Sequence, residues 1–185
     1  MQIFDSVQDY ADFQDLLFQA VVLTGTRLLA WCQMPNHWHL MLWPKLDGEL
    51  STCLRWLSVT HTNRRHAARG TIGTGHLYLG RFKSFVVQGE QHRWTVCRYV
   101  ERNALRAGLV QRAEDWRWSS AHQMAQGNPD GIVAEWPIAR PNSWLSWVNE
   151  PQTQAEQDRL RTSVQRGSPF GAEGWVREAA ECFRL

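Results

Sequence analysis

Apolar and polar positions alternate along the first quarter of the chain with two different periods. In residues 5–24 the apolar side chains follow one another at steps of three and four, which predicts an amphipathic helix that ends at Gly25. Two short apolar runs follow at 27–33 and 37–43, and both have the length of a strand. The turn-forming sequence Met34-Pro35-Asn36 between them predicts a β-hairpin.

The rest of the chain consists of further periodic segments joined by glycine-rich connections. We expect helices over 50–69 and 91–107, and a third strand over 81–88. Residues 127–151 are rich in Pro, Gly, Asn and Trp and predict a long connection, and a pair of helices flanks 167–171. Together these elements predict an α+β fold in which helices back a small antiparallel sheet.

The length and composition fit one compact globular unit. The chain has 185 residues, of which 43% are hydrophobic and 21% are charged. No apolar run is long enough to cross a bilayer, and the N-terminus lacks the basic and apolar regions of a signal peptide. The four cysteines form no C-x-x-C pair, which is typical of a reduced protein. We therefore expect a cytoplasmic protein that has no membrane partner.

Positive charge is concentrated in the middle third of the chain. Residues 55–117 hold twelve basic and four acidic side chains, whereas the net charge of the whole chain is only +2. Most of the basic residues are arginine, whose planar guanidinium suits bidentate contacts with phosphate. Tryptophans interleave with this basic block, as they do on surfaces that bind nucleic acid. A GC-rich genome also produces arginine-rich chains, so composition alone leaves two explanations open.

His37 and His39 are the first candidates for a chemical role. Residues two apart on a strand point to the same face, so the two imidazoles lie side by side and suit two ligands of one metal ion. Tyr99 lies in the predicted basic helix, and Asn103 shares its helix face four residues later. Each pattern also has a structural explanation, namely a histidine pair within a sheet and a buried tyrosine that bonds to that sheet.

Two pairs of cations are candidates for phosphate contacts. Arg81 and Lys83 alternate along the predicted third strand and therefore share one face of it. Arg102 and Arg106 are four residues apart on a helix face next to that of Tyr99. Cations in such positions suit the backbone of DNA, and they also fit a solvated strand and a solvated helix face.

The most specific signal is a set of short sequence strings in a fixed order. They are AWCQMPNHWHL at 30–40, GRFKS at 80–84, YVERN at 99–103 with RAGLV at 106–110, WSS at 118–120 and RGSPFG at 166–171. In this order they resemble the REP-associated tyrosine transposases, which belong to the single-tyrosine HUH transposase superfamily. HUH denotes a histidine, a hydrophobic residue and a second histidine. The resemblance covers nearly the whole chain.

The resemblance implies a fold, a reaction and roles for particular residues. The family fold is a ferredoxin-like (split β-α-β) antiparallel sheet with helices packed on one face. His37 and His39 are expected to bind Mg²⁺ or Mn²⁺, and Asn103 matches the position of a third, polar ligand. Tyr99 is expected to attack a DNA phosphate, which gives a 5′-phosphotyrosine link and a free 3′-hydroxyl. The DNA strand is then rejoined without ATP.

The implied partner is single-stranded or hairpin DNA, such as a REP-like palindrome. The expected DNA-binding residues are all cations of the basic block, namely Arg64, Arg65, Arg81, Lys83, Arg102 and Arg106. We expect residues 1–125 to form the catalytic domain, and 126–185 to form a C-terminal extension with a long loop and helices. Family members occur as dimers and as monomers, and we favour a monomer here.

The sequence departs from the family pattern in three places. Family members carry a further strand ahead of the first helix, and we expect that strand to be missing from the sheet of this chain. Ala104 stands where the family has a proline after the asparagine. Many members continue into a basic tail beyond the position of Leu185, and loss of that tail is expected to weaken the affinity for DNA.

Two other functions remain open on the sequence. A domesticated or truncated transposase binds hairpin DNA without cutting it, and every residue quoted above is compatible with that role. A metal-dependent hydrolase uses His37 and His39 with a water nucleophile, and it needs a third strong ligand and an acid or base nearby. Replacement of Tyr99 by phenylalanine separates these functions, because only the transposase needs the phenol.

Overall fold

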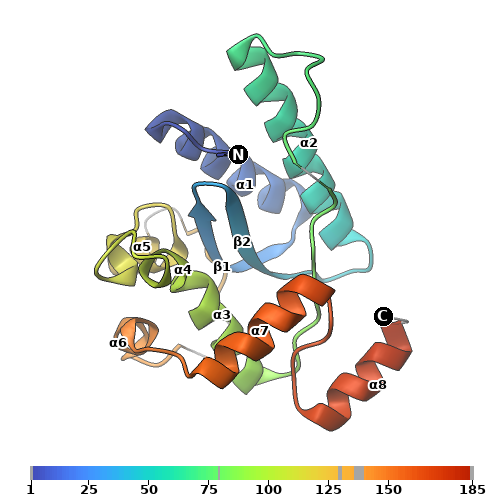
Figure 1. The fold of residues 1–185 in the computed structure, drawn as a ribbon, viewed down its shortest axis with the longest axis vertical. Coiled ribbons are helices and arrows are strands. Elements are labelled where there is room, and N and C mark those ends of the chain that lie inside the picture. The colour runs from blue at the N-terminus through green and yellow to red at the C-terminus, as the bar shows by residue number, and fades with distance from the viewer. Residues whose placement is uncertain (1, 79, 129–130, 136–139, 184–185) are drawn as a thin grey trace.

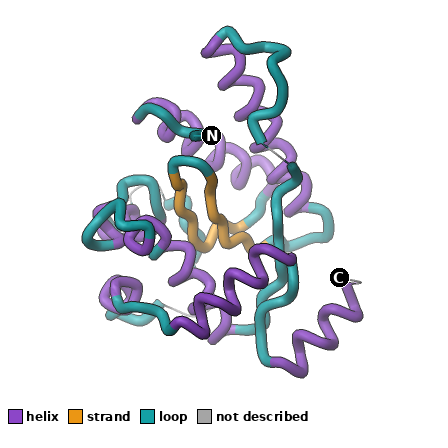
Figure 2. Tube along the Cα trace, in the orientation of Figure 1, coloured by secondary structure: helices purple, strands orange, loops and turns teal. Residues whose placement is uncertain are grey.

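The computed structural model describes residues 2–78, 80–128, 131–135 and 140–183. Helices make up most of this part of the chain, and the strands form one hairpin near its centre (Figure 1, Figure 2). The α+β class predicted from the sequence is confirmed. Within the described ranges no helix has both the length and the apolar character needed to cross a membrane.

Helix α1 (Val7–Thr24) occupies the first predicted helical segment and is stabilised at both ends. The Ser6 hydroxyl accepts a hydrogen bond from the backbone N–H of Asp9, and the Asp9 carboxylate accepts one from the backbone N–H of Ser6. This capping box satisfies N–H groups that have no partner within the helix. Gly25 ends the helix with a φ of 71°, which is a left-handed conformation that glycine adopts without strain.

The predicted hairpin is confirmed as strands β1 (Arg27–Met34) and β2 (His37–Trp43). The strands pair antiparallel around the turn at Pro35 and Asn36. Cys32 lies opposite His39, and a β-bulge interrupts the register between Leu28 and Ala30.

The remaining elements are helical. They are α2 (Glu49–Arg69), α3 (Glu90–Glu101), α4 (Asn103–Arg106), the short 3-10 helix η1 (Ala113–Asp115), α5 (Ser120–Ala125), α6 (Trp144–Asn149), α7 (Gln154–Arg166) and α8 (Glu173–Phe183). The helix predicted over 91–107 is therefore α3 followed directly by α4, with a one-residue break at Arg102. The connection predicted over 127–151 contains the short helix α6.

The third strand predicted over 81–88 is wrong. The backbone of this segment bonds to the chain near Phe170 and not to the hairpin. The N–H of Gln88 donates to the Phe170 oxygen, and the N–H of Phe170 donates to the Val86 oxygen. The hairpin therefore accounts for the whole sheet in the described residues, and the larger ferredoxin-like sheet that the resemblance implies does not form there.

Helices pack against both faces of the hairpin, which corrects the expectation that they pack on one face. Trp31 belongs to a core with α1 and α2, whereas Ala30 and Cys32 belong to a core with α3. The alternation of side chains along a strand explains this division, because neighbouring residues point to opposite faces. Both faces of the hairpin are apolar in sequence, and both are therefore covered.

The outer edge of β1 is covered by the segments around α5. The backbone N–H of Gln33 donates to the Trp118 oxygen at 2.9 Å, and the N–H of Trp31 donates to the Ser120 hydroxyl at 3.0 Å. A buried carboxylate, Glu101, accepts hydrogen bonds from Ser120 and from Trp144, and so ties α3 to α5 and α6. Strand edges with unpaired groups invite aggregation, and these contacts remove that risk on one side of the sheet.

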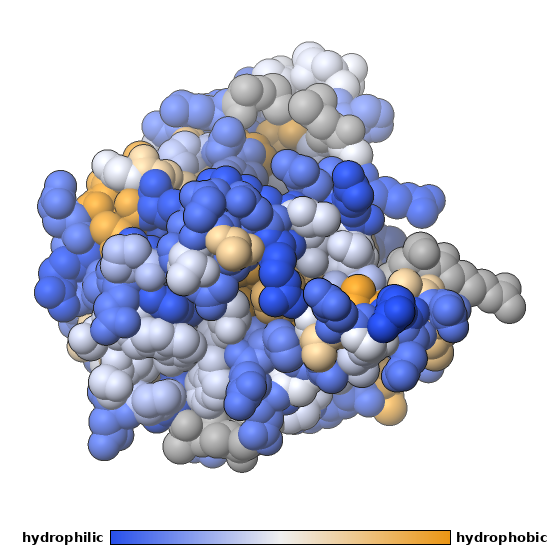
Figure 3. All heavy atoms as spheres, turned by 60° about the horizontal axis from the view of Figure 1, so that its bottom comes forward, coloured by the Kyte–Doolittle hydropathy of each residue, from blue (hydrophilic) through white to orange (hydrophobic). Residues whose placement is uncertain are grey.

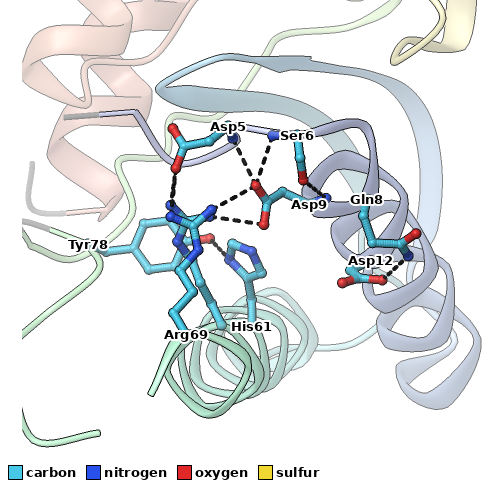
Figure 4. Close-up of polar contacts among 9 residues, drawn as sticks. Asp5, Ser6, Gln8, Asp9, Asp12, His61, Arg69 and Tyr78 are labelled. Atoms are coloured by element: carbon cyan, nitrogen blue, oxygen red, sulfur yellow. Dashed lines mark hydrogen bonds and ion pairs between the residues drawn. The ribbon is translucent and has the colours of Figure 1, made fainter. Parts of the chain in front are cut away.

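A cluster of ion pairs joins the start of α1 to the end of α2. The guanidinium of Arg69 lies 2.7 Å from the Asp5 carboxylate and 2.8 Å from the Asp9 carboxylate. Arg65 contacts the same two acids, at 3.0 and 3.3 Å. Figure 4 shows Arg69 between the two carboxylates, with His61 and Tyr78 beside it. The cluster fixes the position of α2 against the N-terminus.

Candidate active site

The imidazoles of His37 and His39 lie side by side on one face of β2. Their ring centroids are 4.9 Å apart and the rings are nearly perpendicular. Trp38 points to the opposite face and packs in the core with α1 and α2. The strand period of two thus places the two imidazoles together, as the sequence predicts.

Tyr99 faces these histidines from α3. The centroids of the Tyr99 and His39 rings are 5.8 Å apart, and the two rings meet edge to face. α3 reaches this position because it packs across the hairpin, with contacts to β1 and to β2. Only 5% of Tyr99 is exposed, so the ring is held by its surroundings. The phenol and the imidazoles come from one chain and from segments sixty residues apart.

Arg106 and Asn103 complete the polar surroundings of Tyr99. The Arg106 guanidinium stacks over the Tyr99 ring at 4.6 Å from its centroid. The same guanidinium donates to the Asn103 side-chain oxygen at 2.5 Å, and the Asn103 amide donates to the Tyr99 carbonyl at 3.0 Å. Asn103 thus holds the arginine and the helix backbone in place. Its side-chain oxygen, which the resemblance assigns to a metal, accepts a hydrogen bond from Arg106.

The two histidines are neutral at physiological pH. Burial, together with smaller contributions from the nearby His37 and Arg106, lowers the pKa of the His39 imidazole to about 3. Burial likewise lowers the pKa of His37, with a smaller contribution from Arg106. The His37 Nδ1 lies 2.6 Å from the side-chain oxygen of Asn36, and a ring nitrogen beside a carbonyl oxygen is the one that donates. This leaves the His37 Nε2 as an unprotonated nitrogen that can bind a cation.

This donor set fits a divalent cation that takes further ligands from its substrate. Two neutral imidazole nitrogens are good ligands for a transition-metal ion such as Mn²⁺ and acceptable for Mg²⁺. Among the residues that the structure describes, no group of three or more His, Cys, Asp or Glu side chains could hold a metal ion by itself. An ion at His37 and His39 would therefore complete its coordination with water or with phosphate oxygens.

A cavity of about 390 Å³ adjoins the site, and residues of β2, α3 and the segment 83–87 line it. His39, Tyr99 and Lys83 line it together with apolar side chains of β2 and of residues 85–87. In the hairpin register, Trp38 lies opposite Gln33, and Leu40 lies opposite Trp31. The N–H groups of Gln33 and Trp31 point away from β2. By the alternation of antiparallel pairs, the backbone groups of Trp38 and Leu40 point away from β1, toward this cavity. His39, Tyr99 and the outer edge of β2 therefore border one cavity.

The structure separates the predicted DNA-binding cations into two groups. Arg65 forms ion pairs with Asp5 and Asp9. The Arg102 guanidinium donates to the carbonyls of Val148 and Asn149. Both therefore hold parts of the fold together. Arg64 and Arg81 are exposed, and neither side chain has an ion pair or hydrogen bond within the described residues. Lys83 is exposed and donates to the Gln165 carbonyl at 3.1 Å, and Arg106 belongs to the site itself.

Sequence reasoning missed the interactions that orient the site. The bond between Asn36 and His37, and the arginine stacked on Tyr99, both depend on side-chain positions that no residue spacing fixes. One signal was available for the arginine. Asn103 and Arg106 are three residues apart, which places them on neighbouring positions of one helix face.

The chain belongs to the IS200-like transposases. The family described as "Transposase IS200 like" matches residues 2–103, which is more than half of the chain and includes the hairpin, Tyr99 and Asn103. A search of curated proteins and a search of solved structures gave no match. The family identifies a DNA transposase, and DNA as its partner.

Proposed function

We propose that this protein cleaves and rejoins single-stranded DNA through a covalent link to Tyr99. The single observation that carries the proposal is the position of the Tyr99 ring, 5.8 Å from the His39 ring and opening onto the same cavity. A nucleophile next to a pair of neutral metal ligands suits attack on a phosphodiester, whose negative charge must be offset during the reaction.

In the proposed reaction the Tyr99 oxygen forms a bond to the phosphorus of a backbone phosphate. The bond between that phosphorus and the 3′ oxygen of the preceding nucleotide breaks. The phenol loses its proton and the leaving 3′ oxygen gains one, so the products are a 5′-phosphotyrosine and a free 3′-hydroxyl. Attack by another 3′-hydroxyl reverses these steps and joins two strands. Each step exchanges one phosphate ester for another, so no external energy source is needed.

His37 and His39 would hold Mg²⁺ or Mn²⁺, which supplies Lewis-acid stabilisation of charge on the phosphate oxygens. Arg106 places a second positive charge beside the Tyr99 ring. Asn103 fixes that arginine, and we propose this positioning role for it in place of a ligand role, because its oxygen accepts from Arg106. Arg64, Arg81 and Lys83 are the exposed cations that we propose to contact the DNA backbone.

Three finer points belong to the same proposal. The strings at 80–84 and 166–171 favour the REP-associated subgroup, and hence imperfect DNA hairpins as substrates. The histidines and the tyrosine meet within one chain, which supports a monomer as the active unit. A metal-dependent hydrolase is less well supported, because the described residues offer no third His, Cys, Asp or Glu ligand.

The test is the formation of a covalent protein–DNA adduct. The probe is a pool of labelled single-stranded oligonucleotides that carry imperfect hairpins and randomised flanks, incubated with Mg²⁺ or Mn²⁺. We expect a labelled band that survives denaturing electrophoresis in the unaltered protein and in Tyr10→Phe, and its complete loss in Tyr99→Phe. A band that persists in Tyr99→Phe would refute the proposal. Hairpin binding without any adduct in the unaltered protein would support the non-cutting DNA-binding protein instead.

A further inference from the structure

A second and larger cavity, of about 1100 Å³, lies between α2 and residues 76–78 and 80–82. It adjoins the cavity of the candidate active site, because Trp38 and Leu54 line both. The chain that runs from Gly80 to Val87 also lines both, with its first part at the second cavity and its later part at the site. The two cavities are therefore neighbours, and a polymer that follows residues 80–87 would contact both of them.

The charges of the second cavity suit a polyanion. Arg55 and Arg81 line it, both are exposed, and neither side chain has an ion pair or hydrogen bond to any other described residue. Its described lining contains no carboxylate. The Ser58 and Thr62 hydroxyls on α2 donate to backbone carbonyls and can still accept a hydrogen bond, and the Asn63 amide adds both donors and an acceptor. An acidic or phosphate-bearing ligand finds cations here without a competing negative charge.

The apolar part of the lining suits a flat ring. Trp38 and Tyr78 meet edge to face, and the Trp38 indole N–H donates to the Tyr78 hydroxyl at 3.3 Å. The same hydroxyl is bonded to His61 at 2.7 Å, so these rings are fixed before any ligand binds. At the open side, Phe82 and Val59 are 36% and 53% exposed. The cavity thus offers exposed apolar surface beside its fixed aromatic rings.

We propose that this cavity binds an unpaired base of single-stranded DNA, with Phe82 against the ring of the base and Arg55 and Arg81 at the adjacent phosphates. Aromatic side chains within a basic groove are the usual means by which proteins hold single strands. A base within a duplex is covered by its neighbours, so its ring is not available to Phe82. The paired arginines and the absence of carboxylates in the described lining favour this occupant over a peptide. The inference rests on the proposed function, because it places a nucleotide close to the one that Tyr99 attacks.

The experiment compares two polymers that differ only in their bases. One is a 20-nucleotide thymidine oligomer, and the other is an abasic deoxyribose-phosphate polymer of equal length. Binding of each is measured by fluorescence anisotropy over a series of salt concentrations. For the unaltered protein we expect roughly tenfold tighter binding of the thymidine oligomer, because stacking on aromatic side chains adds affinity for each held base. Phe82→Ala should bring that ratio close to one.

Arg55→Ala has a different expected signature. It should weaken both polymers by the same factor and reduce the slope of log K against log salt by about 0.7, as for one lost phosphate contact with a single strand. Arg161→Ala is the matched control, since Arg161 is an exposed arginine of α7 outside both cavities. It should change neither the affinity for the two polymers nor the salt slope. Circular dichroism of each variant establishes that it is folded.

The contrary outcomes are distinct. The base-binding cavity is overturned if Phe82→Ala leaves the ratio of the two affinities unchanged, or if that ratio equals one in the unaltered protein. Either result leaves the proposed DNA reaction intact. The same conclusion follows if Arg161→Ala weakens binding as much as Arg55→Ala. If the unaltered protein binds neither polymer, the proposed function itself fails, and this inference fails with it.

Discussion

The two faces of the β-hairpin look alike in sequence and differ in what the structure builds on them. On one face Trp31 and Trp38 pack with α1 and α2 in a core of aromatic rings. On the other face His37 and His39 meet Tyr99 from α3 beside an open cavity. The same strand thus stabilises the fold through alternate residues and presents its candidate chemistry through the residues between them.

A histidine lies on each side of the hairpin, namely the buried His61 of α2 and the half-buried His39 of β2, and the two show what separates a structural residue from a candidate ligand. Burial lowers the pKa of His61 to about 4 and that of His39 to about 3, so burial alone does not distinguish them. His61 is bonded to the Tyr78 hydroxyl and packed between Phe4 and Phe13. Within the described residues the His39 ring has no hydrogen-bond partner, and it faces a phenol and a cavity. A neutral nitrogen left without a partner beside a cavity is available to a ligand.

Loss of the His39 imidazole should produce the largest effect. We expect His39→Ala to reduce metal-dependent adduct formation by more than about a hundredfold, because metal stabilisation of a reacting phosphate is worth several kcal/mol. His61→Gln, on the other face, should retain most of the activity. The rates of adduct formation in the two variants provide the comparison, and equal losses would remove the distinction between the two histidines.

On the structural face the largest effect should come from Trp31→Ala. Trp31 is fully buried against α1, so its truncation leaves a cavity in the core and should lower the free energy of unfolding by about 3–5 kcal/mol. Urea denaturation measures this value, with Trp31→Phe as the control for a smaller loss of volume. A loss below about 1 kcal/mol would mean that this face is not the main stabilising core.

The depressed pKa of His61 makes stability depend on pH. Above the ordinary histidine pKa of 6.5 the residue is neutral in the folded and in the unfolded chain, so it has no effect. Between pH 6.5 and about 4 only the unfolded chain gains the proton, and stability falls as the pH falls. At pH 5.5 the loss from this residue should be about 1.4 kcal/mol relative to pH 7.5. Urea titrations at the two pH values should show that His61→Gln is less sensitive to acid by this amount, and an equal sensitivity would contradict the assignment.

The ion pairs at the start of α1 should contribute least. Arg69 is 39% exposed, so we expect Arg69→Ala to cost about 1 kcal/mol or less, as is usual for ion pairs near the surface. Arg69 holds the pKa of Asp5 below its usual value of 3.8, so this contribution is present above that pH and disappears as the pH falls below it. Thermal unfolding at pH 7 and at pH 3 measures both values. Arg161→Ala is an appropriate control, because its single ion pair with Asp158 lies within one exposed helix.

Periodicity predicted the parts of the fold that depend on local sequence. The helix over 5–24, the hairpin and the helix over 50–69 all form close to the expected boundaries. The strand over 81–88 does not form, because its backbone bonds to Phe170 and no local pattern reveals a partner so distant in sequence. Helices on both faces of the sheet were missed for a similar reason, since an apolar alternation does not say which helix covers which face.

The candidate site was predicted in its residue types and not in its details. The spacing placed His37 beside His39, and the family resemblance added Tyr99 to them. The resemblance could not show that Arg106 occupies the oxygen of Asn103. The charge of the basic block could not show that an acid binds Arg65 or that a backbone carbonyl binds Arg102. Those partners lie tens of residues away in the sequence.

The most direct test of the central claim is electron–nuclear double resonance on Mn²⁺ bound to the Tyr99→Phe variant in complex with a single-stranded oligonucleotide. The variant keeps the two imidazoles and prevents cleavage. We predict that one Mn²⁺ spectrum shows nitrogen couplings from His37 and His39 and a phosphorus coupling from the DNA backbone. The nitrogen couplings should disappear when both histidines are replaced by alanine. A phosphorus coupling without any imidazole nitrogen would place the metal elsewhere and contradict a shared site for the two histidines and the reacting phosphate.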